Sequence, residues 1–194
     1  MEIVVNDTNV FIDLCSIALI DDFFRLPISV HTVDFVLNEI KNEEQRHIIN
    51  RFIENGKLTV GTFKPTEVIQ IIELRDSAGG NVSFEDCAVW HYAKKNNYTL
   101  LTGDGQLRKK AIASNVMVKG IIYVFDELVA YEIITPLLAV AKLQELMSKN
   151  PRLPKSIIQE RINKWSKLYG ISTYNTPEIF IVRVSLNGNF SQPM

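Results

Sequence analysis

Five short apolar runs alternate with helix-length stretches along this chain. The runs are Ile3–Val5, Ile28–Val30, Leu58–Val60, Tyr98–Thr102 and Val116–Val118. Runs of this length separated by helices are typical of βαβ units, in which helices cover both faces of a parallel sheet. A further apolar run, Ile121–Phe125, can extend the last strand region. The sequence therefore predicts an α/β fold.

Capping residues mark where the helices begin. The predicted N-caps and first helical residues are Thr8 or Asn9, Thr32, Pro65 with Thr66, and Ser83. After Asp126 we expect an apolar helix that runs to about Ser148 and is broken or bent by Pro136.

A clear break follows at Asn150–Pro154. Beyond it, apolar residues recur at helical spacing between Ile157 and Tyr169, so we expect a basic amphipathic helix that docks on the rest of the chain. The run Ile179–Val182 is predicted to be a strand or an extended arm that needs a sheet edge. We accordingly divide the chain into a domain of residues 1–148 and an extension of residues 149–194.

Composition limits the classes of function. The formal net charge of −1 gives no overall basic footprint, so composition alone does not indicate nucleic-acid binding. The two cysteines have no zinc or redox spacing and are expected to pack as small apolar residues. We find no signal-peptide pattern, and the longest apolar stretch, near Ile133 to Ala141, is too short to span a membrane. We expect a soluble, cytoplasmic protein.

Four acidic residues stand out. Asp7 and Asp104 each follow a strand-like run, and the carboxyl ends of parallel strands face one crevice, where open α/β sheets bind ligands. Glu39 and Asp86 lie on helices between those strands. Carboxylates gathered in one crevice repel each other unless a cation holds them. The pattern therefore indicates a hard metal ion and phosphate chemistry.

Each acid also has a structural interpretation. Asp7 can cap a helix, Asp104 can belong to an ordinary turn between two glycines, and Glu39 can be a solvated helix residue. Asp86 can complete a capping box with Ser83, although Val89, Trp90 and Ala93 share its helical stripe and turn it toward packed structure. If there is no metal site, all four acids must have these structural roles, which would be a coincidence.

Two segments carry a resemblance to a known family. They are DTNVFIDL, which begins at Asp7, and SFEDCAVWHYAKKNNYTLLTGDGQLRKKA, which begins at Ser83. Over residues 1 to 145 the chain resembles the PIN-domain family of metal-dependent ribonucleases, which includes VapC-like toxins of toxin-antitoxin pairs. The resemblance implies a three-layer α/β/α fold with a central five-stranded parallel sheet of order 3-2-1-4-5, here with a C-terminal helical or extended appendage.

The resemblance also implies a site and an activity. Asp7, Glu39, Asp86 and Asp104 would surround one or two Mg²⁺ or Mn²⁺ ions, with Thr102 and Asn9 in support. The expected reaction is hydrolysis of phosphodiester bonds in single-stranded or structured RNA. An antitoxin protein and a second copy of the chain are further partners to test.

Basic residues must offset the acids if RNA is to bind. The candidates for phosphate contacts are Arg108, Lys109, Arg152 and Lys155, although solvation is the ordinary role of such side chains. The alternative function is a catalytically inactive PIN-like scaffold or binding module. Loss of one or more of the acids would favour that alternative, and none is lost.

Overall fold

The computed structural model describes residues 1–79 and 81–167 of the chain. Its centre is one parallel sheet with the strand order β3-β2-β1-β4-β5. The strands are β1 (Ile3–Asn6), β2 (Ser29–Val33), β3 (Leu58–Gly61), β4 (Thr99–Leu101) and β5 (Val118–Lys119). The predicted α/β/α fold, the five-stranded parallel sheet and the strand order are confirmed.

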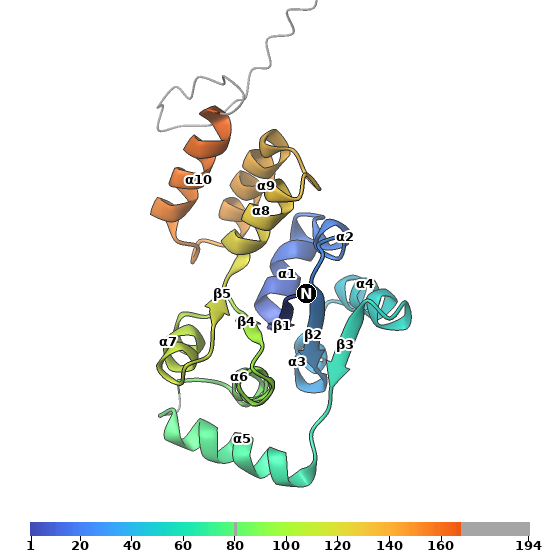
Figure 1. The fold of residues 1–194 in the computed structure, drawn as a ribbon, viewed down its shortest axis with the longest axis vertical. Helices are drawn as coiled ribbons and strands as arrows, with labels where there is room; N and C mark the ends of the chain where they lie inside the picture. Colours follow the sequence, from blue (N-terminus) through green and yellow to red (C-terminus); the bar gives the residue numbers. More distant parts are fainter. Residues whose placement is uncertain (80, 168–194) are drawn as a thin grey trace, which may run out of the picture.

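Helices flank the sheet on both sides (Figure 1). The first group is α1 (Thr8–Ser16), α2 (Ile20–Phe23), α3 (Asp34–Glu39), α4 (Glu43–Glu54) and α5 (Pro65–Ser77). The second group is α6 (Phe84–Asn96), α7 (Gly105–Ala113), α8 (Ile121–Ala130), α9 (Pro136–Lys149) and α10 (Lys155–Lys167). Helix α6 packs across β1, β2 and β4, whereas α1 and α8 to α10 lie on the other side of the sheet in Figure 1.

The strands are apolar because both faces of the sheet are covered. Val4 and Val5 of β1 and Leu100 and Leu101 of β4 are fully buried. Consecutive residues of a strand point to opposite faces, so burial of both neighbours requires helices on both sides. This explains why the strands are continuous apolar runs in the sequence.

One predicted strand extension is a helix. Ile121–Phe125 opens α8, and the buried residues Ile121, Val124, Phe125 and Leu128 follow helical spacing. A short apolar run has no periodicity that separates a buried strand from a buried helix, which is why the strand prediction was wrong. The apolar helix predicted after Asp126 is broken, not bent. Helix α8 ends at Ala130, and Pro136 begins α9 as a separate element, in a position where its missing N–H costs nothing.

Two predicted N-caps were also wrong. Asp7, not Thr8 or Asn9, caps α1, and its carboxylate accepts from the Thr8 backbone N–H. Thr32 lies inside β2, where its hydroxyl donates to the Asn6 carbonyl, and Val33 precedes α3 without a side-chain cap. The predicted helix starts at Pro65 and Ser83 are confirmed.

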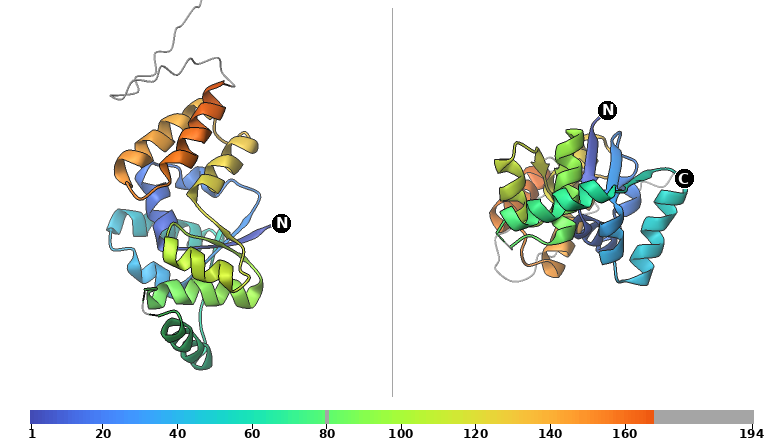
Figure 2. Two further views of the ribbon diagram at one scale, coloured as in Figure 1. Left: turned by 90° about the vertical axis from the view of Figure 1, so that its left-hand side faces the viewer. Right: turned by 90° about the horizontal axis from the view of Figure 1, so that it is seen from below.

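The C-terminal helices form a group at one end of the molecule (Figure 2). Helix α10 packs on α9, and its residues Ile158, Ile162 and Trp165 are buried in the same apolar cluster as the sheet. The predicted arm at Ile179–Val182 lies outside the described residues, and the division at residue 148 stays a prediction. Within the described residues, no helix is long and apolar enough to cross a membrane.

Candidate active site at the carboxyl ends of β1 and β4

The pairing of β1 with β4 brings the two segments of the candidate site together. Asn6 is opposite Leu101 in the parallel register, and the Asp7 backbone N–H donates to the Leu101 carbonyl at 3.0 Å. Asp7 directly follows Asn6, and Thr102 directly follows Leu101, so the two residues lie side by side. The adjacency of residues far apart in the sequence is thus a direct result of strand pairing.

Asp7 is held by three donors in a buried place. Its side chain accepts from the Thr8 N–H at 2.7 Å, the Thr102 hydroxyl at 2.8 Å and the Asn9 amide at 3.3 Å. Only 1% of its surface is exposed. Burial, followed by repulsion from Asp86, raises the pKa of Asp7 to about 7, although these hydrogen bonds oppose the shift.

Glu39, the last residue of α3, has its side chain next to Thr8, the residue that follows Asp7. Its Oε2 accepts from the Thr8 hydroxyl at 2.5 Å, which ties α3 to the first turn of α1. Burial raises the pKa of Glu39, the Thr8 hydrogen bond opposes the shift, and Glu85 and Asp86 add to it by repulsion. The Thr8 contact rules out a freely solvated helix glutamate.

Asp86 does form the capping box that the sequence allowed. Its Oδ2 accepts from the Ser83 backbone N–H at 3.1 Å, and its own N–H donates to the Ser83 hydroxyl at 2.9 Å. The carboxylate is nevertheless half-buried, and burial raises its pKa, with Asp104 and Glu85 adding repulsion. Asp86 therefore helps to cap the start of α6 and is an electrostatic neighbour of the other acids at the same time.

Asp104 caps α7, and Thr102 connects it to Asp7. Oδ1 of Asp104 accepts from the backbone N–H groups of Gln106 and Leu107, at 2.8 and 2.7 Å. The hydroxyl of Thr102 accepts from the Asp104 N–H while it donates to Asp7. The predicted supporting roles of Thr102 and Asn9 correspond to these contacts with Asp7.

The four acids are electrostatic neighbours without forming a closed set of ligands. Among residues 1–79 and 81–167, no three His, Cys, Asp or Glu side chains are arranged to hold a metal ion. Three carboxylates keep one oxygen without a hydrogen bond to the described residues, namely Oε1 of Glu39, Oδ1 of Asp86 and Oδ2 of Asp104. Free carboxylate oxygens beside a buried carboxylate fit the donor chemistry of a hard divalent cation. The metal ligands stay a prediction.

The four residues predicted to contact RNA differ in exposure and in neighbours. Lys109 on α7 and Lys155 at the start of α10 are exposed. Arg108 instead turns toward backbone, with weak hydrogen bonds to the carbonyls of Thr102 at 3.3 Å and Val118 at 3.4 Å. Arg152, in the connection between α9 and α10, borders a cavity that Asp104 also lines.

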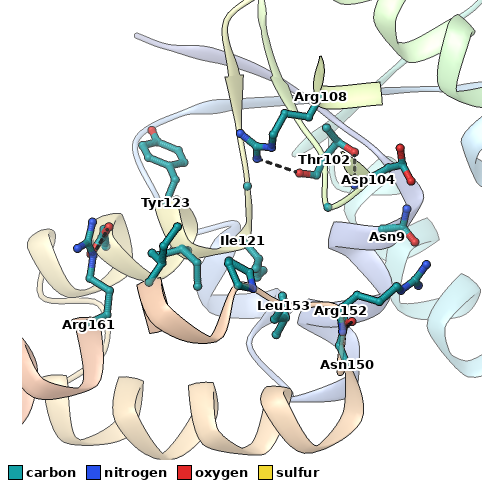
Figure 3. Close-up of a pocket in the computed structure, with 16 residues that line it drawn as sticks. Asn9, Thr102, Asp104, Arg108, Ile121, Tyr123, Asn150, Arg152, Leu153 and Arg161 are labelled. Carbon is teal, nitrogen blue, oxygen red and sulfur yellow. Dashed lines mark hydrogen bonds and ion pairs between the residues drawn. The ribbon is translucent and has the colours of Figure 1, made fainter. Parts of the chain in front are cut away.

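That cavity lies between the candidate site and the C-terminal helices (Figure 3). Its volume is about 520 Å³. Asn9, Thr102 and Asp104 border one end of it, and Asp126 and Arg161 the other. The C-terminal helices thus contribute walls to a space that, of the four candidate acids, borders Asp104.

Sequence reasoning missed the contacts that fix this arrangement. The side chain of Asn150 donates to both carboxylate oxygens of Asp13 on α1, each at 3.2 Å, and Lys149 donates to the Ser16 carbonyl. Asp13 lies between Phe11 and Leu14 in a mostly apolar helix, and a buried carboxylate requires a partner. The position of Asp13 in an apolar helix could have indicated that it has a partner. It could not have identified Asn150, which is more than a hundred residues away in sequence.

Comparison with protein-family models matches residues 3–167 to the PIN domain (DUF3368). The chain belongs to the PIN-domain family. The match runs from β1 of the PIN domain through the last residue of α10. It therefore includes both acidic segments and the helices that enclose the cavity. A search of curated proteins found no match.

Solved structures similar to this PIN-domain chain share little sequence with it. PAE2754 from Pyrobaculum aerophilum is 15% identical, with a TM-score of 0.48 over 67% of this chain and 98% of that chain. VapBC2 from Rickettsia felis, bound to a DNA fragment from its promoter, is 16% identical, with a TM-score of 0.44 over 61% and 98%. FitAcB from Neisseria gonorrhoeae is 16% identical, with a TM-score of 0.38 over 59% and 95%.

Proposed function

We propose that this protein is a metal-dependent endoribonuclease that hydrolyses phosphodiester bonds of single-stranded or structured RNA. The observation that carries the proposal is the buried carboxylate of Asp7, with Asp86 as its electrostatic neighbour. A charge buried beside a like charge lowers stability unless an opposite charge offsets it. A divalent cation offsets both, and membership of the PIN-domain family supports nuclease chemistry.

Asp7, Glu39, Asp86 and Asp104 would hold one or two Mg²⁺ or Mn²⁺ ions. When bound, such an ion supplies positive charge to the phosphate oxygens and makes a water easier to deprotonate. Asp7 would be the central ligand, because the Thr102, Thr8 and Asn9 donors fix both of its oxygens. Glu39 would act as a ligand or as a base that orients the water.

Basic side chains would hold the RNA backbone against the repulsion of the acids. Arg152 borders the cavity beside Asp104, and the exposed Lys109 and Lys155 lie on α7 and α10. Contacts of this type give affinity that falls with salt and carry no sequence information.

Three further expectations belong to the same proposal. The chain works in the cytoplasm, an antitoxin protein controls it if it is the toxin of a toxin-antitoxin pair, and two copies can associate. The competing function is a PIN-like scaffold without activity. The presence of all four acids favours the enzyme.

The deciding experiment is cleavage of a mixed single-stranded RNA pool with Mg²⁺ or Mn²⁺. The wild type is compared with Asp7→Asn and with a reaction that contains EDTA. We expect cleavage that disappears in both controls. Cleavage that persists in Asp7→Asn would indicate a contaminating nuclease, and absence of both cleavage and calorimetric metal binding would favour the scaffold.

A further inference from the structure

The cavity between the acids and the C-terminal helices has a polar end, an apolar middle and a second polar end. Its walls come from the β4–α7 turn, the start of α8 and the α9–α10 connection (Figure 3). Ligand cavities in proteins commonly measure about 300–1,000 Å³, and this one measures about 520 Å³. The space is large enough for one nucleotide.

Arg152 supplies the positive charge at the end beside the acids. Figure 3 shows its side chain next to Asn9 and on the same side as Asp104. Within residues 1–79 and 81–167 its guanidinium makes no hydrogen bond or ion pair, unlike those of Arg108 and Arg161. Its charge lowers the pKa of Asp13, but its N–H groups have no partner among these residues and can bind a phosphate group through two parallel hydrogen bonds.

The middle of the cavity is apolar. Ile121 from α8 and Leu153, Pro154 and Ile157 from the C-terminal segment line it, and 44% of the Ile157 surface is exposed. An exposed isoleucine on the wall of a cavity leaves apolar surface for a ligand to cover. A nucleobase has flat apolar faces of the right size for such walls.

The far end offers both a donor and an acceptor. Arg161 donates to both oxygens of Asp126, at 2.9 and 3.0 Å, and this pair lines the cavity. The polar edge of a nucleobase carries donors and acceptors, so it can meet such a pair without leaving buried groups unpaired. The order of phosphate, apolar face and polar edge is the order found along a nucleotide.

Contacts across the fold hold Arg152 in place. The Asn150 side chain is fixed by both oxygens of Asp13, and its own Oδ1 accepts from the Arg152 backbone N–H at 3.2 Å. Asp13 belongs to α1, the helix that Asp7 caps. The position of Arg152 is therefore tied to the same helix as the candidate active site.

We propose that this cavity is a subsite for one nucleotide of single-stranded RNA next to the bond that is cut, with its phosphate on Arg152 and its base between Ile121, Leu153 and Ile157. The inference rests on the proposed nuclease function for its substrate class. It adds a role for the C-terminal helices, which would select RNA with an unpaired nucleotide at that position.

Binding of the four nucleoside 5′-monophosphates to the full chain in EDTA tests the subsite without catalysis. Inorganic phosphate is the comparison ligand, and calorimetry or NMR titration gives the affinities. We expect at least one nucleotide to bind at least about tenfold more tightly than phosphate, since the apolar middle contacts the base. No nucleotide binding, or affinity equal to that of phosphate, would overturn the proposal.

Three variants locate the binding. Arg152→Gln and Ile157→Glu are each expected to weaken nucleotide binding at least about fivefold, because they remove the phosphate contact and place a charge against the base. Arg46→Gln, an exposed arginine on α4, is the matched control and should leave affinity unchanged. Equal weakening in Arg46→Gln would mean nonspecific attraction and would overturn the subsite. Circular dichroism confirms that each variant is folded.

Cleavage kinetics separate this inference from the proposed function. With RNA substrate and Mg²⁺, we expect Arg152→Gln to raise KM at least about fivefold with a smaller change in kcat. Nucleotide binding without any cleavage would contradict the nuclease and keep the cavity as a nucleotide site. Cleavage with an unchanged KM in Arg152→Gln would contradict the subsite and leave the nuclease intact.

Discussion

At the scale of single residues, Asp7 has two features. Its carboxylate caps α1, and it is a buried acid beside a second acid. It caps α1 through Oδ1 and is held by Thr102 through Oδ2. Because these donors satisfy the carboxylate, its burial is tolerated, but repulsion from Asp86 remains. The ionised carboxylate is therefore expected to lower the stability of the metal-free protein, and in the proposed function a cation would offset its charge.

The first prediction concerns the loss of stability that comes from burying the ionised Asp7 carboxylate. The pKa of Asp7 is raised from 3.8 to about 7, so between those values the folded protein binds more protons than the unfolded chain. Stability in EDTA should therefore fall as pH rises through this window. Asp7→Asn cannot ionise, so its free energy of unfolding does not fall in this way. At about pH 8 we expect its melting temperature to exceed that of the wild type by about 2–4 °C for each kcal/mol of stability that the wild type has lost.

Differential scanning fluorimetry in EDTA at a series of pH values gives this comparison. The difference should be small near pH 5, where most Asp7 carboxyls are protonated, and excess Mg²⁺ should stabilise the wild type more than Asp7→Asn because of cation binding. A constant difference across the pH range would show that Asp7 ionises near its ordinary value.

At the scale of elements, the starts of α1, α6 and α7 carry three of the four acids. Asp7 and Asp104 are N-caps, and Asp86 is the third residue of α6. Helix N-termini favour negative charge, which partly offsets the repulsion between the acids. At Asp86 and Asp104 the structural and functional interpretations are therefore compatible, because one carboxylate oxygen caps the helix while the other has no hydrogen bond to the described residues.

The second prediction separates capping from charge at α6. Asp86→Asn keeps an oxygen that can accept from the Ser83 N–H, so we expect a free energy of unfolding within about 0.5 kcal/mol of the wild type. Ser83→Ala removes the cap and should cost about 1 kcal/mol. Metal-dependent cleavage should fall about a hundredfold or more in Asp86→Asn, but less than about tenfold in Ser83→Ala.

Urea unfolding and cleavage rates of both variants are the measurements. Glu73→Gln, an exposed acid on α5, is the control for loss of one negative charge. If activity followed stability across all three variants, Asp86 would act only by starting the helix.

At the scale of the whole molecule, α8, α9 and α10 cover one end of the PIN domain and share its core. Phe125 of α8 and Trp165 of α10 lie with ring centroids 6.4 Å apart, and Trp165 is 2% exposed. The family match also includes α10. These contacts make the C-terminal helix a part that is expected to unfold with the sheet.

The third prediction tests this coupling. Trp165→Ala should lower the free energy of unfolding by about 3–5 kcal/mol, because it leaves a large cavity between α10 and its neighbours. Urea unfolding followed by circular dichroism and by the fluorescence of Trp90 should give one coincident transition. Lys164→Ala, its exposed neighbour, should change stability by less than about 0.5 kcal/mol. Separate transitions would instead support an independent unit after residue 148.

The sequence by itself determined the fold class and the approximate positions of the strands, and it singled out the four acids. It did so because buried parallel strands require continuous apolar runs, such as Val4–Val5 and Leu100–Leu101, and because Asp7 and Asp104 directly follow such runs. It could not distinguish strand from helix at Ile121–Phe125, where the periodicity is too short to decide.

Tertiary structure decided everything that joins distant residues. The hydrogen bond of Thr8 to Glu39, the contact of Asn150 with Asp13 and the cavity beside Asp104 each link segments that the chain brings together only on folding. Local sequence specifies backbone preference and burial, whereas the partner of a buried polar group depends on which surfaces finally pack. For that reason the sequence predicted the acids, and only the fold showed that the C-terminal helices stand beside them.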